Sequence, residues 1–151
     1  MSELREPFSD HNFWGSETVH ASRDIQVLFP VGIRDNELSQ LRAKYLMVNS
    51  PFVTSYGIAQ LIKQWLKGSR EIDRIDLEGL QSLNINTILG AIGEATVMSW
   101  NNLLRKWKSG EIWNNASEAN NRVGIESENG LLMLLAESGK CIVLDTAKEN
   151  V

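Results

Sequence analysis

Residues 56–80, YGIAQLIKQWLKGSREIDRIDLEGL, carry two periodicities in succession, one typical of a helix and one typical of a strand. In the first half, apolar residues recur three and four positions apart, at Ile58, Leu61, Ile62, Trp65 and Leu66. Gly68 follows at a position where glycine commonly ends a helix. In DRIDLE, apolar and charged residues alternate, as in a strand with one buried face. The stretch therefore predicts an amphipathic helix that leads into a half-buried strand.

The charged face of this strand raises the question of a chemical site. Asp76 and Glu78 project from the same face of a strand, about 7 Å apart, whereas Asp73 points to the opposite face. Three carboxylate ligands for a metal ion therefore do not converge. Two carboxylates near this separation are able to act as acid and base, but no histidine lies nearby in the sequence. We interpret Asp76 and Glu78 as a partner-binding surface, with a small hydrolase that uses this pair as the alternative.

Patterns before and after this unit predict three further elements. DIQVLFPVGI, residues 24–33, predicts a strand, and Pro30 places it at the edge of a sheet because proline lacks an N–H donor. Apolar residues at helical spacing predict one helix from Asp35 to about Val48. The same spacing predicts a long helix from about Asn86 to Lys108.

The C-terminal part of the chain changes to strand patterns. RVGIES, LLMLLAE and CIVLD are short apolar segments separated by Asn-Gly and Ser-Gly pairs, which favour tight turns. They predict a β-meander whose middle strand is apolar on both faces and lies in the interior of a sheet. The expected fold class is α+β, with central helices packed on a mixed sheet and a C-terminal three-stranded meander.

The N-terminal residues 1–22 are polar and aperiodic, which predicts a flexible arm followed by a single domain over 23–151. Two tryptophans, Trp14 in this arm and Trp113 near a basic segment, are predicted to be exposed. Exposed tryptophan is common at the centre of protein–protein interfaces. Trp14 and Trp113 therefore join Asp76 and Glu78 as candidate partner-binding residues.

Composition narrows the function classes. A chain of 151 residues with 42% hydrophobic and 23% charged residues is typical of one globular domain. Its net charge of −4 and isoelectric point near 5.2 argue against nucleic acid as a partner, because nucleic-acid binding depends on Lys and Arg. A protein partner with a basic surface suits this charge better, and homo-oligomerisation stays open.

Cysteine content and hydropathy indicate the compartment. The single cysteine, Cys141, excludes an intrachain disulfide framework and a Cys-x-x-Cys metal or redox motif. No window reaches the roughly 20 apolar residues of a membrane span, and the N-terminus lacks the apolar core of a signal peptide. We therefore expect a cytoplasmic protein that does not enter a membrane and that uses no cofactor.

Two segments resemble known families. FVTSYGIAQLIKQWL followed by IDRIDLEGLQSLNINTILGAIGEA, about residues 50–98, resembles the strand, helix, strand and helix unit of STAS-like regulatory domains, with Asp76 and Gly79 at the turn after the strand. The Asp-Ser-Gly phospho-acceptor turn of the anti-sigma-factor antagonists is absent, and Ser82 and Thr87 align loosely with it. The C-terminal half is similar to the helix and three strands that end roadblock-type modules, without their usual first hairpin.

Both resemblances imply a regulatory or scaffolding module without catalytic activity. The expected function is therefore protein–protein binding with no chemistry of its own. One alternative in the same class is an acidic inhibitor or immunity-type protein that masks a basic site on its target. The alternative from a different class is the small hydrolase that uses Asp76 and Glu78.

Overall fold

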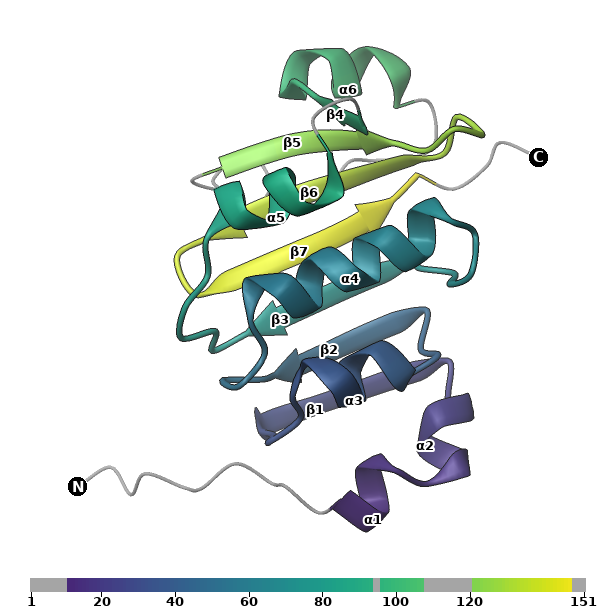
Figure 1. Cartoon of the computed structure of the whole chain (residues 1–151), viewed down its shortest axis with the longest axis vertical. Helices are drawn as coiled ribbons and strands as arrows, with labels where there is room; N and C mark the ends of the chain where they lie inside the picture. The colour runs from purple at the N-terminus through teal and green to yellow at the C-terminus, as the bar shows by residue number, and fades with distance from the viewer. Residues whose placement is uncertain (1–10, 94–95, 108–120, 148–151) are drawn as a thin grey trace.

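A computed structural model describes residues 11–93, 96–107 and 121–147. Within these residues, seven strands form one mixed sheet in the order β1-β2-β3-β7-β6-β5-β4 (Figure 1). The strands are β1 (Asp24–Pro30), β2 (Tyr45–Asn49), β3 (Arg74–Glu78), β4 (Val97–Met98), β5 (Asn121–Glu126), β6 (Leu132–Ser138) and β7 (Cys141–Thr146). The helices are α1 (His11–Trp14), α2 (Glu17–Ala21), α3 (Asp35–Gln40), α4 (Ser55–Leu66), α5 (Ile85–Ile92) and α6 (Trp100–Lys106).

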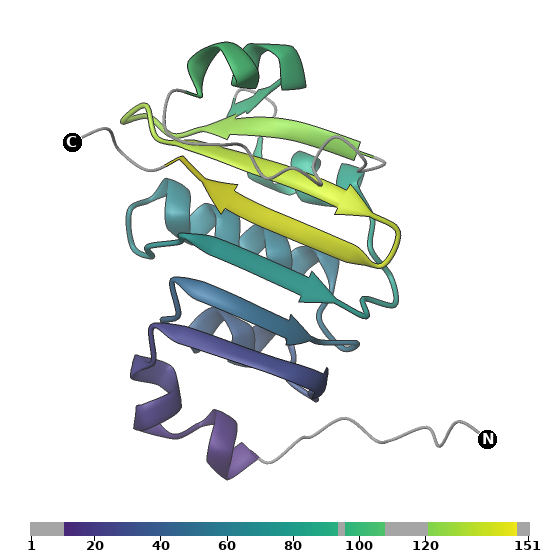
Figure 2. The same cartoon turned by 180° about the vertical axis from the view of Figure 1, so that it is seen from behind.

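The N-terminal half of the sheet is parallel. β1, β2 and β3 run in the same direction and are connected through α3 and α4. These helices and α5 lie on one face of the sheet, and the view from behind shows the strands of this half in front of them (Figure 2). Leu46 and Val48 of β2 and Ile75 and Leu77 of β3 are at most 1% exposed under the helices. The alternation in DRIDLE thus corresponds to one buried and one outer face, as the sequence predicts.

The C-terminal half is the predicted antiparallel meander. β7 pairs with β3, β6 with β7, and β5 with β6. The main core is the cluster of buried residues between the sheet and helices α3, α4 and α5, and it includes Met133 and Leu135 of β6. Leu134 packs on the other face of the sheet with Leu103 of α6. The middle strand is therefore covered on both faces, which confirms the prediction from its apolar sequence. The α+β class with a mixed sheet is also confirmed.

Helix α4 is the amphipathic helix of the opening stretch, and its end follows the glycine signal. Gly68 has a φ of +75°, and its N–H donates to the Trp65 carbonyl at 3.0 Å. The Ser69 N–H donates to the Gln64 carbonyl at 3.0 Å, which completes a Schellman motif. Trp65 itself is 6% exposed and belongs to the main core.

The predicted N-terminal arm is wrong for residues 11–22. This segment forms α1 and α2, which lie beside β1 at the lower end of the molecule in Figure 1. Trp14 is 1% exposed and, with Val19, belongs to the main core. The expectation that Trp14 is exposed for a partner is therefore also wrong. Its hydrophobic area serves the core of the domain instead.

The predicted helix from Asp35 to about Val48 is wrong in its second half. Helix α3 ends at Gln40, and the chain enters β2 at Tyr45. The apolar residues of YLMV fit both a helical and a strand period. The segment forms a strand because it pairs with β1 on one side and with β3 on the other.

The predicted helix from about Asn86 to Lys108 is also wrong as a single element. Helix α5 ends at Gly93, which has a φ of +95°, and the chain then forms β4. Helix α6 begins after Ser99, whose side chain accepts from the Asn102 N–H at 3.3 Å. Lys108 lies outside the described residues. A glycine cap and a serine cap therefore divide a pattern that looks continuous.

None of the helices in the described residues is both long and apolar enough to span a bilayer.

Candidate functional site

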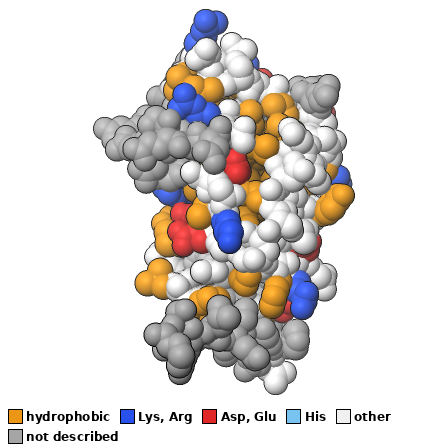
Figure 3. All heavy atoms as spheres, turned by 90° about the vertical axis from the view of Figure 1, so that its left-hand side faces the viewer, with side chains coloured by type: hydrophobic (Ala, Val, Ile, Leu, Met, Phe, Trp, Pro, Cys, Tyr) orange, Lys and Arg blue, Asp and Glu red, His pale blue; other side chains and the backbone are white. Residues whose placement is uncertain are grey.

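The carboxyl ends of β1, β2 and β3 meet at one end of the sheet, which faces the viewer in Figure 3. In β1, Val27 pairs with Val48 and Pro30 pairs with Asn49, so Leu28 and Phe29 have no opposite residue in β2. Such a bulge in an edge strand redirects side chains. Leu28 is 85% exposed and Phe29 is 52% exposed.

The connection from β2 to α4 adds two aromatic side chains at the same end. Phe52 is 39% exposed, and the guanidinium of Arg34 lies 4.7 Å from the centre of its ring. Tyr56, in the first turn of α4, is 71% exposed. We call Leu28, Phe29, Phe52 and Tyr56 the carboxyl-end surface. Figure 3 shows hydrophobic side chains spread over this end of the molecule, among acidic and basic groups.

Asp76 and Glu78 lie on the sheet face that points away from α3 and α4. Because Glu78 pairs with Asn49 and Asn49 with Pro30, Glu78 lies two strands from the bulge, about 10 Å across the sheet. The two carboxylates therefore share one face, as the strand pattern predicts, and Glu78 lies at the same end of the sheet as the carboxyl-end surface.

The Asp76 carboxylate is the more enclosed of the pair. Its side chain is 13% exposed, and the Arg74 Nη2 lies 3.9 Å from its Oδ2. Burial and, secondarily, the charge of Glu78 raise the pKa of Asp76, while Arg74 acts in the opposite direction. A raised pKa beside a second carboxylate is a property of acid–base pairs. In the part of the chain that the structure describes, no group of three His, Cys, Asp or Glu residues is able to hold a metal ion.

Cys141 begins β7 next to this acidic face. Burial, followed by the charges of Glu78 and Asp76, raises the pKa of the Cys141 thiol, so the thiol is less nucleophilic than a free cysteine. His20 lies at the opposite end of the sheet, where its carbonyl accepts from the Arg42 N–H ahead of β2. Cys141 and His20 therefore do not form a nucleophile–base pair.

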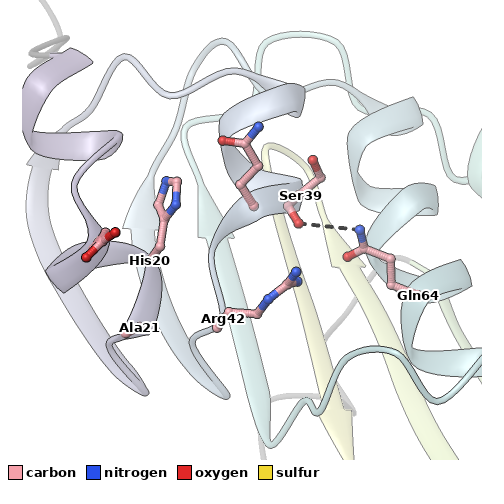
Figure 4. A pocket seen from close by; sticks show the side chains of 7 residues that line it. His20, Ala21, Ser39, Arg42 and Gln64 are labelled. Carbon is pink, nitrogen blue, oxygen red and sulfur yellow. Dashed lines mark hydrogen bonds between the residues drawn. The ribbon is translucent and has the colours of Figure 1, made fainter.

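At the opposite, amino end of the parallel strands, the sequence reading missed two neighbouring hollows that are both lined by Ala21 and Arg42. One has a volume of about 570 Å³ and is drawn in Figure 4; the other has a volume of about 340 Å³. A sequence signal does exist, since a basic residue stands just before each parallel strand: Arg23 before β1, Lys44 before β2, and Arg70 a few residues before β3. The amino ends of neighbouring parallel strands meet, so these charges gather.

The remaining sequence candidates are scattered. Trp14 is in the core, and Trp113 lies outside the described residues. Ser82 is exposed in the connection between β3 and α5. Thr87 is half-buried in the first turn of α5, where its N–H donates to the Asn84 side chain at 3.4 Å.

Comparison of the chain with protein-family models found no match, and comparisons with curated proteins and with solved structures found none either.

Proposed function

We propose that this protein acts by binding a partner protein through the carboxyl-end surface, without catalysing a reaction. The observation that carries the proposal is the β1 bulge, which leaves Leu28 85% exposed and Phe29 52% exposed side by side. Isolated apolar residues on a surface are normal, but several large ones at one end of a domain indicate an interaction site.

The geometry around the bulge supports the same proposal. Leu28 and Phe29 come from an edge strand, Phe52 from the connection between β2 and α4, and Tyr56 from the first turn of α4, so residues far apart in the sequence contribute to one end of the sheet. In open sheets with parallel strands, the carboxyl ends of the strands are the usual place for binding. Aromatic side chains are also the most frequent centres of protein interfaces.

The acidic pair indicates the chemistry of the partner. Glu78 lies at the same end of the sheet as the carboxyl-end surface, Asp76 lies on the same strand face, and the chain carries a net charge of −4. A partner that presents an apolar centre with a basic rim would complement both features. An inhibitor that masks a basic site on its target is a special case of this arrangement. The single cysteine suits a reducing compartment such as the cytoplasm.

A small hydrolase remains the second candidate, because one specific observation favours it. Burial and the charge of Glu78 raise the pKa of Asp76, which is the direction of shift that a general acid requires. Under this candidate function, Asp76 would act as the acid and Glu78 as the base. The two candidates differ in whether the exposed apolar residues or the carboxylates are essential.

The experiment is an affinity capture from the native cell with three forms of the protein in parallel. Leu28→Ser combined with Tyr56→Ser removes apolar area from the carboxyl-end surface. Leu104→Ser is the matched control, because Leu104 is a 43% exposed leucine on α6. We expect a partner that the wild type and Leu104→Ser retain and that the double variant loses. A partner retained equally by all three forms would contradict the proposal.

A further inference from the structure

Positive charge gathers at the amino end of the parallel strands. Backbone hydrogen bonds bring the relevant segments together: the Lys44 N–H donates to the Arg23 carbonyl at 2.9 Å, and the Asp73 N–H donates to the Lys44 carbonyl at 2.8 Å. The 340 Å³ hollow at this place is lined by four basic residues and one acidic residue: Arg23, Arg42, Lys44, Arg70 and Glu71.

Most of this positive charge is not neutralised. Glu71 forms an ion pair with Lys44. Among the described residues, no carboxylate lies within ion-pair distance of Arg23, Arg42 or Arg70. The carboxylate of Glu71 also feels the charge of Arg23, so one acidic residue faces four basic ones and the hollow carries an excess of positive charge in a chain whose net charge is negative.

The burial of the Arg70 guanidinium lowers the stability of the protein when no anion is bound. It is 4% exposed, and its guanidinium donates to the carbonyls of Leu38, at 3.3 Å, and Ala43, at 3.4 Å. Within the described part of the chain, its Nε has no hydrogen-bond partner. Burial and the charge of Arg42 lower the pKa of Arg70 to about 10. A buried cation with only neutral partners is unfavourable unless an anion accompanies it.

The larger hollow continues from the smaller one, because both are lined by Ala21 and Arg42. In Figure 4, His20 comes from α2 and Gln64 from α4, and the Arg42 side chain extends into the space between them. The His20 Nε2 and the Gln64 Oε1 are buried, and neither atom has a hydrogen-bond partner among the residues that the structure describes. Buried polar atoms of this kind are rare and mark a place where a further polar group is expected.

We propose that these two hollows bind a small phosphorylated molecule, with its phosphate among Arg23, Arg42 and Arg70 and its remainder beside His20 and Gln64. Guanidinium groups bind phosphate oxygens with paired hydrogen bonds. A phosphate dianion matches this excess of positive charge better than a single carboxylate does. The site lies at the end of the sheet opposite the carboxyl-end surface, so it does not depend on the proposed partner binding.

The first test measures thermal stability in inorganic phosphate and in chloride at matched ionic strength. A ligand that binds the folded state raises the melting temperature. Phosphate also stabilises folded proteins without a site, because it is excluded from their surface. We therefore expect phosphate, relative to chloride, to raise the melting temperature of the wild type more than that of Arg42→Gln. An equal rise in the two proteins would overturn the proposal.

The second test titrates pyrophosphate by calorimetry against the wild type and two single variants. Arg42→Gln removes the charge of an exposed arginine of the site, and Arg105→Gln removes the charge of an exposed arginine on α6 as the control. Charge-assisted hydrogen bonds are strong, so Arg42→Gln should weaken pyrophosphate binding about tenfold or more. Arg105→Gln should leave it unchanged. Equal effects of the two variants would identify nonspecific attraction and reject the site.

Two further probes distinguish the source of the phosphate. Vesicles that contain phosphatidic acid, bound by the wild type and displaced by pyrophosphate, would assign the phosphate to a lipid headgroup. Failure of the vesicles to bind, together with pyrophosphate binding, would assign it to a soluble molecule. A single-stranded oligonucleotide that binds while pyrophosphate does not would overturn the proposal in favour of nucleic acid.

Discussion

The carboxylate of Asp35 joins the amino ends of two consecutive helices. Asp35 is the first residue of α3, and it accepts from the Thr54 N–H at 2.8 Å and from the Thr54 hydroxyl at 2.5 Å. Thr54 is the N-cap of α4, so one negative charge lies at the positive ends of both helix dipoles. Gly57 in α4 provides the space, because a Cβ at this position would come within 2.1 Å of the Asp35 Oδ1. The contact fixes the start of α4 against α3. Phe52 lies just before this start, and Tyr56 lies in the first turn of α4.

This contact predicts strong coupling between positions 35 and 57. Asp35→Ala should lower the free energy of unfolding by about 1.5 to 3 kcal/mol, because it removes hydrogen bonds to a charged acceptor. Gly57→Ala alone should cost about 1 to 3 kcal/mol through overpacking. In the Asp35→Ala background the carboxylate is gone and only the Cβ of residue 35 stays close to the added carbon, at 2.9 Å, so the same alanine should cost clearly less than it does in the wild type. Urea denaturation of the four proteins checks this cycle, and additive effects would contradict it.

Helix α4 predicts opposite outcomes for two of its aromatic residues. Trp65 is 6% exposed in the main core, so Trp65→Ala should lower the free energy of unfolding by about 3 to 5 kcal/mol. Tyr56 is 71% exposed on the same helix, so Tyr56→Ala should change it by less than about 0.5 kcal/mol. Thermal and urea denaturation measure both effects. An unchanged melting temperature in Trp65→Ala would show that this face of α4 is not buried.

The N-terminal helices predict a second contrast, between adjacent residues. The rings of Phe13 and Trp14 meet edge to face with centroids 5.0 Å apart, but Trp14 is 1% exposed and Phe13 is 44% exposed. Trp14→Ala should therefore lower the free energy of unfolding by about 3 to 5 kcal/mol. Phe13→Ala should cost clearly less, because much of that ring already contacts solvent. Removal of residues 1–22 should destabilise the domain as strongly as Trp14→Ala does; a truncated protein that melts like the full chain would refute the packing of Trp14.

The acidic pair distinguishes the partner-binding proposal from the hydrolase. Asp76→Asn combined with Glu78→Gln keeps the shape and removes two negative charges. If the pair faces a basic partner, the association rate should fall, and the difference from wild type should shrink as salt rises, because exposed charges are screened over roughly 8 Å at physiological ionic strength. If the pair is an acid and a base, turnover of a substrate should be lost at every salt concentration. Stopped-flow association with the captured partner measures the first outcome.

Asp76 also predicts a pH dependence of stability. Its pKa is raised in the folded protein, so the folded state holds this proton more tightly than the unfolded state does. The resulting stabilisation is fully present below the unfolded pKa of about 4 and is lost as the pH rises through the folded pKa. Asp76→Asn carries no such proton, so the wild type should lose stability relative to this variant as the pH rises from about 4 towards neutral. Parallel denaturation curves at several pH values check the trend, which the opposite slope would contradict.

The sequence was sufficient to predict a helix or strand where its apolar residues follow a single period and a specific residue ends the element. Helix α4 follows its apolar spacing up to Gly68, and β3 follows the alternation of Ile75 and Leu77 with charged residues. Pro30 marks an edge strand, because among the described residues β1 pairs only with β2. The shared face of Asp76 and Glu78 also follows from the strand period alone.

Prediction from the sequence failed where the same residues fit a helical and a strand period equally well. Leu46 and Val48 continue a helical pattern from Leu38, yet they pair with β1 and β3 as a strand. Trp14 stands in a segment without periodicity, and only its packing shows that it belongs to the core. Neither case contains a local signal that would choose between the alternatives.

The sequence by itself determined the class of the fold, the α4–β3 unit, the meander and the strand face that carries the two carboxylates. Those features depend on spacing within a short segment, which the backbone geometry of helices and strands converts directly into a face. Only the tertiary structure decided that Trp14 is buried, that a bulge exposes Leu28, and that Arg23, Arg42 and Arg70 surround one hollow. These features arise from pairing and packing between segments that are distant along the chain, and no local period encodes which of those segments will meet.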